Sequence, residues 1–126
     1  MKELTELAEK VKTELRLKYD SDSVKYLEGF IERQKTRFPG DEAKGLINSC
    51  GAFLGQCIIE NYGGKWFHDN NGQVAISFDS QNMVYPFAKV NKQFTNGLED
   101  SVYSMYITIP SVFKLASKTK KKWWQF

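Results

Sequence analysis

The sequence predicts an α+β fold: three N-terminal helices, the third central and buried, packed on a small antiparallel β-meander, with one or two short C-terminal helices. Apolar residues recur at helical spacing through residues 1–40, and residues 41–62 are apolar on almost every side of a helix. From residue 65 the apolar residues alternate, as in a strand. With 126 residues, of which 41% are hydrophobic, the chain 1–126 suits a single domain with one core.

The N-terminal part of the chain is expected to form two amphipathic helices. In the first, over residues 2–18, the apolar side chains share one face and Glu and Lys occupy the others. Ser21, Asp22 and Ser23 are candidate N-caps of the second helix, which the run Phe38-Pro39-Gly40 should end.

The stretch 41–62 is predicted to be the central helix, capped by Asp41 and ended by Gly63-Gly64. Gly51 and Gly55 lie on one side of it, and each costs about 1 kcal/mol relative to alanine inside a helix. We expect the close approach of another backbone, from a helix or a strand, to offset that cost. No strand is expected before these glycines, so they do not form a phosphate-binding loop.

Both cysteines, Cys50 and Cys57, lie in this helix, about 10 Å apart along its axis. That separation exceeds the Cα distance of about 7 Å that a disulfide spans. It also lacks the close spacing of redox or metal-binding thiol pairs. We therefore expect two buried thiols that are not bonded to each other.

Residues 65–87 are predicted to form the meander. Asn71-Gly72 is a hairpin signal, and residues 74–79 alternate between apolar and small or polar side chains, as in a half-buried strand. Pro86 cannot donate a ladder hydrogen bond, which places the end of the last strand at an edge or outside the sheet.

Residues 88–112 allow two interpretations, short helices or a fourth strand. The residues up to Asn96-Gly97 suit a short helix that this pair would end. Over 98–109, apolar residues at helical spacing follow two acidic residues that favour a helix start, but residues with high β propensity also alternate there. The helix is the favoured interpretation, and Pro110 should end either element.

The segment 113–126 is basic and aromatic. It holds five lysines and no acidic residue, so the rest of the chain has a net charge of −2 although the whole has +3. Lysines bind phosphates, and neighbouring aromatic side chains stack on bases or lie at a membrane interface. The favoured alternative is that the aromatic side chains pack back on the domain over an open sheet face. The speculative interaction residues of this tail are Lys120, Lys121, Lys122, Trp123 and Trp124.

His68 is the only histidine, which excludes a site built from two histidines of this chain. Beside Asp69 it is compatible with an acid–base or metal site, but its alternation with Trp66 favours a structural position in a strand. The carboxylates that could act with it lie mainly at turns, where Asp and Glu serve as caps: Glu60, Asp69, Asp79, Glu99 and Asp100. The sequence contains no nucleophile elbow, phosphate-binding loop or metalloprotease motif. We therefore assign no catalytic, cofactor-binding or metal-binding residue.

Four short motifs stand out between about residues 46 and 106: Gly51-Ala52-Phe53-Leu54-Gly55-Gln56, Tyr62-Gly63-Gly64-Lys65-Trp66, Tyr85-Pro86-Phe87-Ala88-Lys89-Val90, and Asn96-Gly97 followed by Asp100-Ser101-Val102. In these motifs the chain resembles small bacterial proteins of uncharacterised function, some of them encoded near secretion-system or polymorphic-toxin loci. The resemblance concerns structural residues and implies an immunity-type or accessory protein without assigning catalytic residues.

The sequence thus favours a cytoplasmic protein-interaction module with another protein as partner, and we do not expect it to bind nucleic acid. The acidic N-terminal stretch does not resemble a secretory signal, and no stretch approaches the roughly 18–20 apolar residues of a membrane span. Two alternatives stay open. In the first, the chain is a small-ligand binder or an enzyme that uses His68 with neighbouring carboxylates. In the second, it is a peripheral binder of anionic surfaces through its Lys-Trp-Trp tail.

Overall fold

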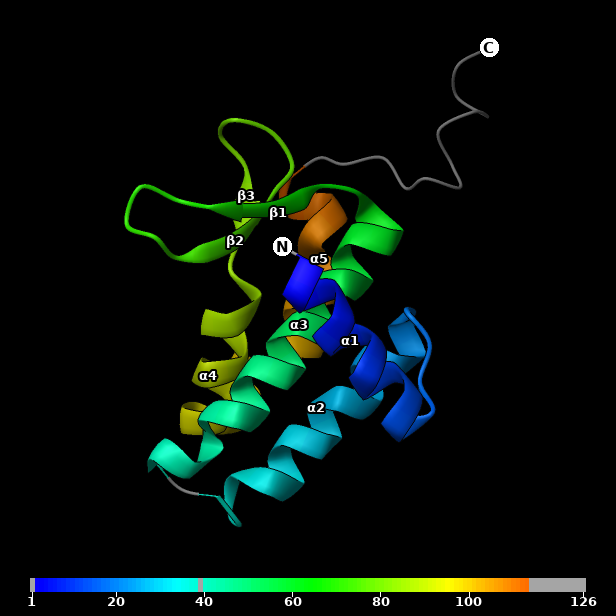
Figure 1. Cartoon of the computed structure of the whole chain (residues 1–126), viewed down its shortest axis with the longest axis vertical. Coiled ribbons are helices and arrows are strands. Elements are labelled where there is room, and N and C mark those ends of the chain that lie inside the picture. Colours follow the sequence, from blue (N-terminus) through cyan, green and yellow to red (C-terminus); the bar gives the residue numbers. More distant parts are fainter. Residues whose placement is uncertain (1, 39, 114–126) are drawn as a thin grey trace.

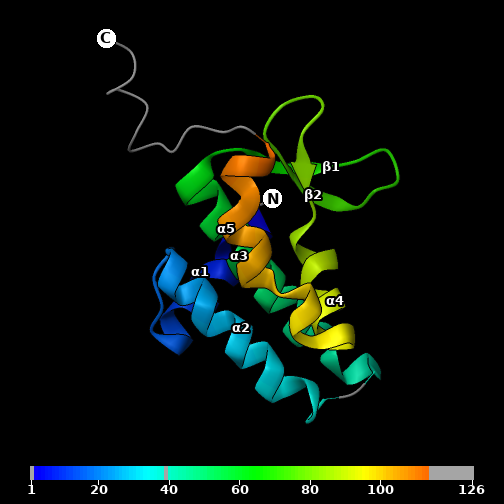
Figure 2. The same ribbon diagram turned by 180° about the vertical axis from the view of Figure 1, so that it is seen from behind.

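The computed structural model describes residues 2–38 and 40–113 and shows an α+β fold (Figures 1 and 2). Three helices come first, a three-stranded antiparallel sheet follows, and two more helices complete the described part of the chain. The sheet lies at one end of the helical layer (Figure 1). The elements are α1 (Lys2–Leu15), α2 (Ser21–Lys35), η1 (Gly40–Ala43), α3 (Lys44–Tyr62), β1 (Lys65–His68), β2 (Val74–Ser77), β3 (Met83–Val84), α4 (Pro86–Asn96), η2 (Gly97–Asp100) and α5 (Val102–Val112).

Helix α3 is the central element, as its sequence predicts. It packs against α1 and α4, and residues 50–58 are all buried because apolar side chains occupy almost its whole circumference. Gly63 ends it with a φ of 89°, a conformation that glycine adopts readily. The predicted start at Asp41 is wrong. Gly40–Ala43 forms a 3₁₀ turn, which is common at helix N-termini, and α3 begins at Lys44 without a side-chain cap.

Two aromatic rings sit directly on the backbone of α3 at its interior glycines. A Cβ atom at Gly51 would lie 2.3 Å from Cδ1 of Phe87, and one at Gly55 would lie 2.1 Å from Cη2 of Trp66. The two rings also contact each other, with centroids 5.9 Å apart and planes tilted by 36°. The predicted close approach therefore occurs, but aromatic side chains make it instead of another backbone.

Helices α1 and α2 form the amphipathic layer that the sequence predicts, with α1 packed on α3. Helix α1 ends earlier than expected, at Leu15, where Arg16 leaves the helical conformation with a φ of 56°. Asp20 caps α2, because its side chain accepts a hydrogen bond of 2.8 Å from the backbone N–H of Ser23. The predicted cap at Ser21, Asp22 or Ser23 is therefore wrong by at least one residue.

The predicted meander is a three-stranded antiparallel sheet in the order β1-β2-β3. Trp66 pairs with Ile76 and Ile76 with Val84, so these three side chains share the face directed at the helices. The predicted hairpin turn is present, with Gly72 at a φ of 80°. The sheet ends before residue 87, because Pro86 lies in the first turn of α4. Backbone N–H groups of the first turn make no hydrogen bond within the helix, so a proline costs nothing there.

Residues 98–109 contain no strand, so the fourth-strand alternative is wrong, but they are not one helix either: the 3₁₀ turn η2 ends at Asp100, Ser101 is extended, and α5 begins at Val102. Ser101 caps α5 by accepting a hydrogen bond of 3.1 Å from the N–H three residues on. Side chains with high β propensity, such as Tyr106, lie on the buried face of the helix, so burial outweighs local preference. The prediction that Pro110 ends the element is wrong: the helix continues to Val112, and the N–H of Phe113 still donates to the carbonyl of Ile109 at 3.0 Å, so the one bond that Pro110 cannot make does not stop the last turn.

A buried polar network joins α2, α4 and α5, which lie together in the view of Figure 2. Gln93 of α4 is fully buried, and its Nε2 donates to the backbone carbonyl of Glu28 at 3.0 Å and to the carboxylate of Glu32 at 2.8 Å. Its Oε1 accepts from the backbone N–H of Val102 at 3.0 Å. The Ser101 hydroxyl donates to the carboxylate of Glu28. Gln93 thus satisfies buried polar groups on two other helices and fixes how α4 is turned.

Replacing Gly55 by alanine is expected to lower the free energy of unfolding by about 1–3 kcal/mol, because the added Cβ collides with the Trp66 ring. Gly45→Ala in the same helix is the matched control. No atom lies within 4 Å of its added Cβ, so it should raise stability by up to about 1 kcal/mol. Urea denaturation followed by circular dichroism measures both. Equal effects of the two substitutions would contradict the seating of the ring on Gly55.

Gln93→Leu is expected to destabilise the protein by about 3 kcal/mol, because it leaves the buried backbone N–H of Val102 without its acceptor and removes the donor to the Glu32 carboxylate. Gln81→Leu, at an exposed position of the β2–β3 loop, serves as control and should change stability by less than about 0.5 kcal/mol. Thermal unfolding of both variants tests this. Similar melting temperatures for the two would show that the network adds no stability.

Candidate functional site

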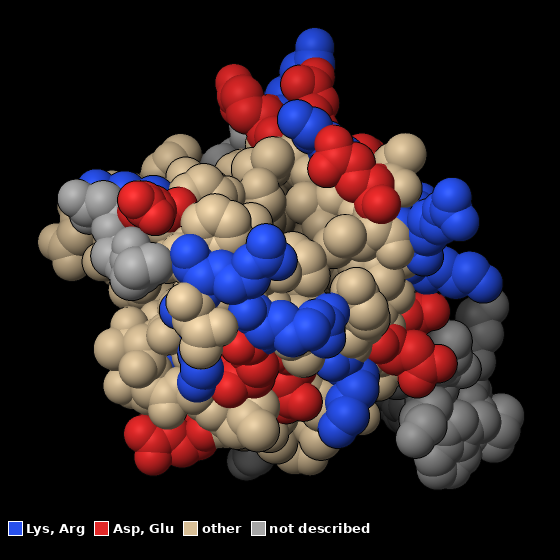
Figure 3. Space-filling model, turned by 90° about the horizontal axis from the view of Figure 1, so that it is seen from below, with Lys and Arg blue, Asp and Glu red and all other residues tan. Residues whose placement is uncertain are grey.

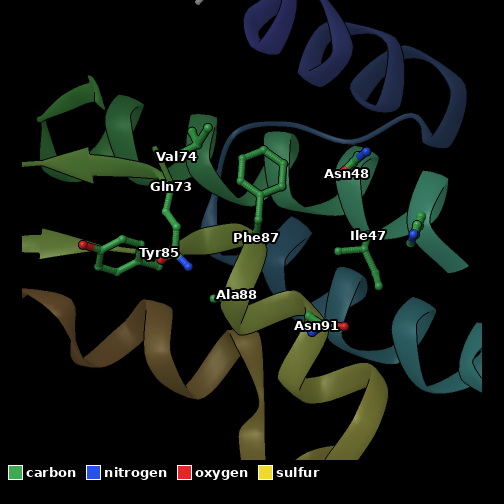
Figure 4. Close-up of a pocket in the computed structure, with 9 residues that line it drawn as sticks. Ile47, Asn48, Gln73, Val74, Tyr85, Phe87, Ala88 and Asn91 are labelled. Carbon is green, nitrogen blue, oxygen red and sulfur yellow. The ribbon is translucent and has the colours of Figure 1, made fainter. Parts of the chain in front are cut away.

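An open cavity of about 520 Å³ lies beside α4, where the start of α3 and the β1–β2 hairpin come close to it (Figure 4). Its wall comes from three parts of the chain that are far apart in sequence. Tyr85 and Ile47 lie on opposite sides of it, with Phe87 and Ala88 between them (Figure 4). The lining residues are Lys44, Ile47, Asn48, Gln73, Val74, Tyr85, Phe87, Ala88 and Asn91.

A second open cavity, of about 380 Å³, continues the first along α4 toward α5. The two share Gln73, Tyr85 and Ala88, so they are parts of one depression. We call the residues that line the two cavities together the α4 groove. The second cavity adds Met83, Val84, Lys89, Lys92 and Met105.

The orientation of α4 determines which of its residues line the groove. Val90 and Gln93 are buried on one side of the helix. Ala88, Asn91 and Lys92 are exposed and share the other side, because residues three and four positions apart are neighbours on a helix surface. The α4 groove therefore lies on the exposed side of α4, and the contact of Gln93 with α2 lies on the buried side.

The lining of the α4 groove is apolar with basic and amide groups around it. Apolar surface comes from Ile47 of α3, from Val74 at the start of β2 and from Phe87 of α4. Asn48, Gln73 and Asn91 supply amides that both donate and accept hydrogen bonds. Three lysines and no carboxylate are among the lining residues; the lysines are Lys44, Lys89 and Lys92.

One carboxylate, Asp100 of η2, lies behind the lysines of α4. It accepts a hydrogen bond of 2.7 Å from the Asn96 amide and one of 3.4 Å from Lys89 Nζ. The hydrogen bond from Asn96 and then the charges of Lys89 and Lys92 hold the pKa of Asp100 below its usual range. Asp100 thus orients Lys89 and offsets part of its charge, and the groove remains net basic.

The same basic character continues at the end of the molecule where α3 begins and α4 ends, the lower end in Figure 1. Seen from that side, Lys and Arg side chains form a band across the centre, with Asp and Glu along part of its edge (Figure 3). Lys44 is the first residue of α3, and Lys92 lies in the second half of α4. The groove therefore leads toward a surface that attracts negative charge.

The β1–β2 hairpin is tied to the groove through Asp69. One carboxylate oxygen accepts from the backbone N–H groups of Asn71 and Gln73, at 2.8 and 2.9 Å, and the other accepts from the Tyr85 hydroxyl at 3.1 Å. These backbone bonds, with the Tyr85 hydroxyl, lower the pKa of Asp69, and the same contact raises the pKa of Tyr85. Asp69 therefore holds both the hairpin loop and one wall of the groove.

The structure does not assemble His68 and the candidate carboxylates into a catalytic group. His68 is exposed at the end of β1, opposite Val74. Asp79 holds the β2–β3 loop through hydrogen bonds from Asn82 and Gln81, and Glu60 accepts from Gln56. Glu99 is exposed in η2. Among residues 2–38 and 40–113, no three His, Cys, Asp or Glu side chains come together as a metal site would require.

Both cysteines are buried and free, as the sequence predicts. Burial raises the pKa of the Cys50 thiol to about 12 and also raises that of Cys57. At neutral pH both are therefore thiols, which are poor nucleophiles and poor metal ligands.

The predicted tail residues Lys120, Lys121, Lys122, Trp123 and Trp124 lie outside the described residues. The α4 groove itself was not predicted. The motif Tyr85-Pro86-Phe87-Ala88-Lys89-Val90 was singled out only as a structural resemblance, although four of its residues line the groove. The other walls come from α3 and the hairpin, whose proximity to α4 no local pattern reveals.

No protein-family model, curated protein or solved structure matches this chain. The resemblance to bacterial proteins near toxin loci therefore stays a prediction. Within the described part of the chain, no helix is both long enough and apolar enough to cross a bilayer.

The stability of the protein is expected to fall as the pH drops below about 4, because Asp69 and Asp79 have lowered pKa values when folded. As the pH falls, each of these carboxylates takes up a proton in the unfolded chain before it does so in the folded protein. The stabilisation is therefore complete above the pKa of the unfolded chain and is lost as the pH falls through the lower pKa of the folded protein. Urea denaturation between about pH 6 and pH 2 measures the slope. The double variant Asp69→Asn/Asp79→Asn should show a shallower decline, and an unchanged slope would contradict this assignment.

Proposed function

We propose that the chain is a cytoplasmic protein-interaction module that binds an acidic segment of another protein in the α4 groove. The observation that carries the proposal is the combination of apolar lining with three lysines and no carboxylate among the lining residues. This concentration of positive charge occurs on a chain that has a net charge of −2 outside its last 13 residues. A segment with acidic and apolar side chains complements both features.

The openness of the groove favours a peptide segment over a small molecule. Sites for small ligands enclose roughly 70–90% of the ligand surface. The α4 groove is instead two joined, open depressions that share Gln73, Tyr85 and Ala88. A polypeptide can place one apolar side chain near Ile47 and Phe87 and another near Met83 and Met105, with carboxylates toward the lysines.

The charge of the groove also argues against the chain's own C-terminal segment as its occupant. Residues 114–126 carry five lysines and no acidic residue, so the groove lysines repel them. The resemblance at Gly51–Gln56 and Tyr85–Val90 implies an accessory or immunity-type role. In such a role the partner would be a secreted or toxic protein. We include that role in the proposal.

Selection of a random-peptide library displayed on phage tests the proposal with the full chain as bait. Enriched peptides are expected to carry net negative charge and at least one large apolar residue. The variant Ala88→Glu/Lys92→Glu should weaken their binding at least tenfold, because it reverses charge and adds bulk at two exposed positions of α4. Thr13→Glu/Lys18→Glu, at two exposed positions at the end of α1 and in the α1–α2 loop, across the molecule from α4 in Figure 1, makes the same change in net charge and is the control that should bind normally.

Three results would overturn the proposal. They are a failure to enrich any peptide, enrichment of peptides without net negative charge, and binding that Ala88→Glu/Lys92→Glu leaves unchanged. Amide chemical shifts of the labelled protein locate the site independently. With an enriched peptide, the changes should centre on Ile47, Val74 and Ala88.

A further inference from the structure

Strand β3 forms the edge of the sheet that borders the α4 groove. Within the described residues it pairs only with β2, through Ile76–Val84 and Ser77–Met83. The strand then leads into α4 through Tyr85, the residue before the helix, which is labelled in Figure 4. We call the side of β3 that faces away from β2 the β3 edge.

The register of the ladder shows which backbone groups point to the β3 edge. The N–H of Phe78 donates to the carbonyl of Asn82 at 2.8 Å, one position before the pair Ser77–Met83. Hydrogen-bonded and non-hydrogen-bonded pairs alternate in an antiparallel ladder, so Ser77 and Met83 form a non-hydrogen-bonded pair. The N–H and carbonyl of Met83 therefore point away from β2, and no hydrogen bond joins them to a described residue. The N–H of Tyr85 points the same way, two residues on.

The second cavity of the α4 groove follows this edge. Three consecutive residues, Met83, Val84 and Tyr85, line it. Successive side chains of a strand point to opposite faces of the sheet, so a cavity that touches all three runs along the edge and not along one face. Its other lining residues, apart from Gln73, belong to α4 and α5: Ala88, Lys89, Lys92 and Met105. The β3 edge and the basic side of α4 thus border one open space of about 380 Å³.

We propose, on the basis of the proposed function above, that the acidic partner segment binds in an extended conformation as an additional strand on the β3 edge. Its backbone accepts hydrogen bonds from the N–H groups of Met83 and Tyr85 and donates one to the carbonyl of Met83. Every second side chain of the added strand then faces α4, where carboxylates meet Lys89 and Lys92.

The short length of β3 limits what the backbone contributes. The strand has two residues, and Pro86 follows Tyr85 without an N–H to offer. About three backbone hydrogen bonds are therefore available to the partner, and side-chain contacts in the α4 groove supply the rest of the affinity.

Two other occupants fit the β3 edge less well. A helical segment satisfies its own backbone groups and would leave those of Met83 without partners. A second copy of this chain, paired edge to edge, would bring Lys89 and Lys92 of both copies to the same space, where like charges repel. An extended acidic segment satisfies the backbone groups and complements the lysines.

Amide hydrogen exchange of the full chain, measured by NMR, tests the proposal directly. The probe is the peptide that the phage selection enriches most strongly. At saturation it should slow the exchange of the Met83 and Tyr85 amides about tenfold or more, because both become hydrogen-bonded. The Gln81 amide, which already donates to Asp79 in the β2–β3 loop, is the internal control and should change less than about twofold.

A proline substitution removes the exposed donor. Met83→Pro lacks the N–H that points to the β3 edge, and no ladder bond to β2 depends on that group. It should weaken binding of the same peptide about tenfold, whereas Met83→Ala keeps the N–H and should weaken it less than about threefold. The urea midpoints of the two variants show whether both are folded.

N-methylation of the peptide, one residue at a time, gives a readout that does not depend on any variant of the protein. In an added strand only every second N–H faces β3. Methylation at those residues should weaken binding about tenfold, and methylation at the residues between them should weaken it less than about threefold.

Each contrary result excludes the added strand. These results are unchanged exchange at Met83, equal effects of Met83→Pro and Met83→Ala in folded protein, and N-methylation effects without alternation. If Ala88→Glu/Lys92→Glu still weakens binding in those cases, the proposed function stands and only the strand addition fails. If no peptide is enriched, both fail. Light scattering that shows a dimer of the wild-type chain and a monomer of Met83→Pro would assign the β3 edge to a second copy instead.

Discussion

The absence of a side chain at two positions of α3 is the constraint on which much of the structure depends. Gly51 and Gly55 allow the rings of Phe87 and Trp66 to lie on the helix backbone, closer than any Cβ would permit. Trp66 belongs to β1 and Phe87 to α4, so this one contact places both the sheet and the fourth helix against α3. Phe87 is also a wall of the α4 groove, which therefore exists where it does because residue 51 is glycine.

A second, polar constraint determines how α4 is rotated. The contacts with α3 are apolar and fix distance more than orientation, because the hydrophobic effect is not directional. Gln93 adds hydrogen bonds, which are directional, to Glu28 and Glu32 on α2 and to Val102 on α5. With Gln93 facing inward, Ala88, Asn91 and Lys92 necessarily face solvent. The internal network and the proposed binding surface are thus opposite sides of one helix.

The candidate site was much less predictable than the fold. Its lysines and amides have no distinctive spacing, and they come from α3, the hairpin and α4. His68 is notable in the sequence because it is the only histidine, but it lies exposed at the end of β1 and belongs to no metal-binding cluster of the described residues. The candidate carboxylates Asp69 and Asp79 were correctly expected at turns, where their hydrogen bonds to loop N–H groups occupy them. What the sequence could not indicate was that Asp69 also holds Tyr85, sixteen residues away.

Local patterns alone determined the order of the elements, the buried character of α3, the hairpin at Gly72 and the two separate thiols. Each depends on periodicity or turn chemistry within a few residues, which a linear sequence displays directly. Contacts between distant segments decided the rest: the choice of helix over strand in α5, the aromatic partners of Gly51 and Gly55, and the α4 groove. Their energies depend on which surfaces meet, and burial against a distant partner outweighs the small differences in local propensity that a sequence reveals.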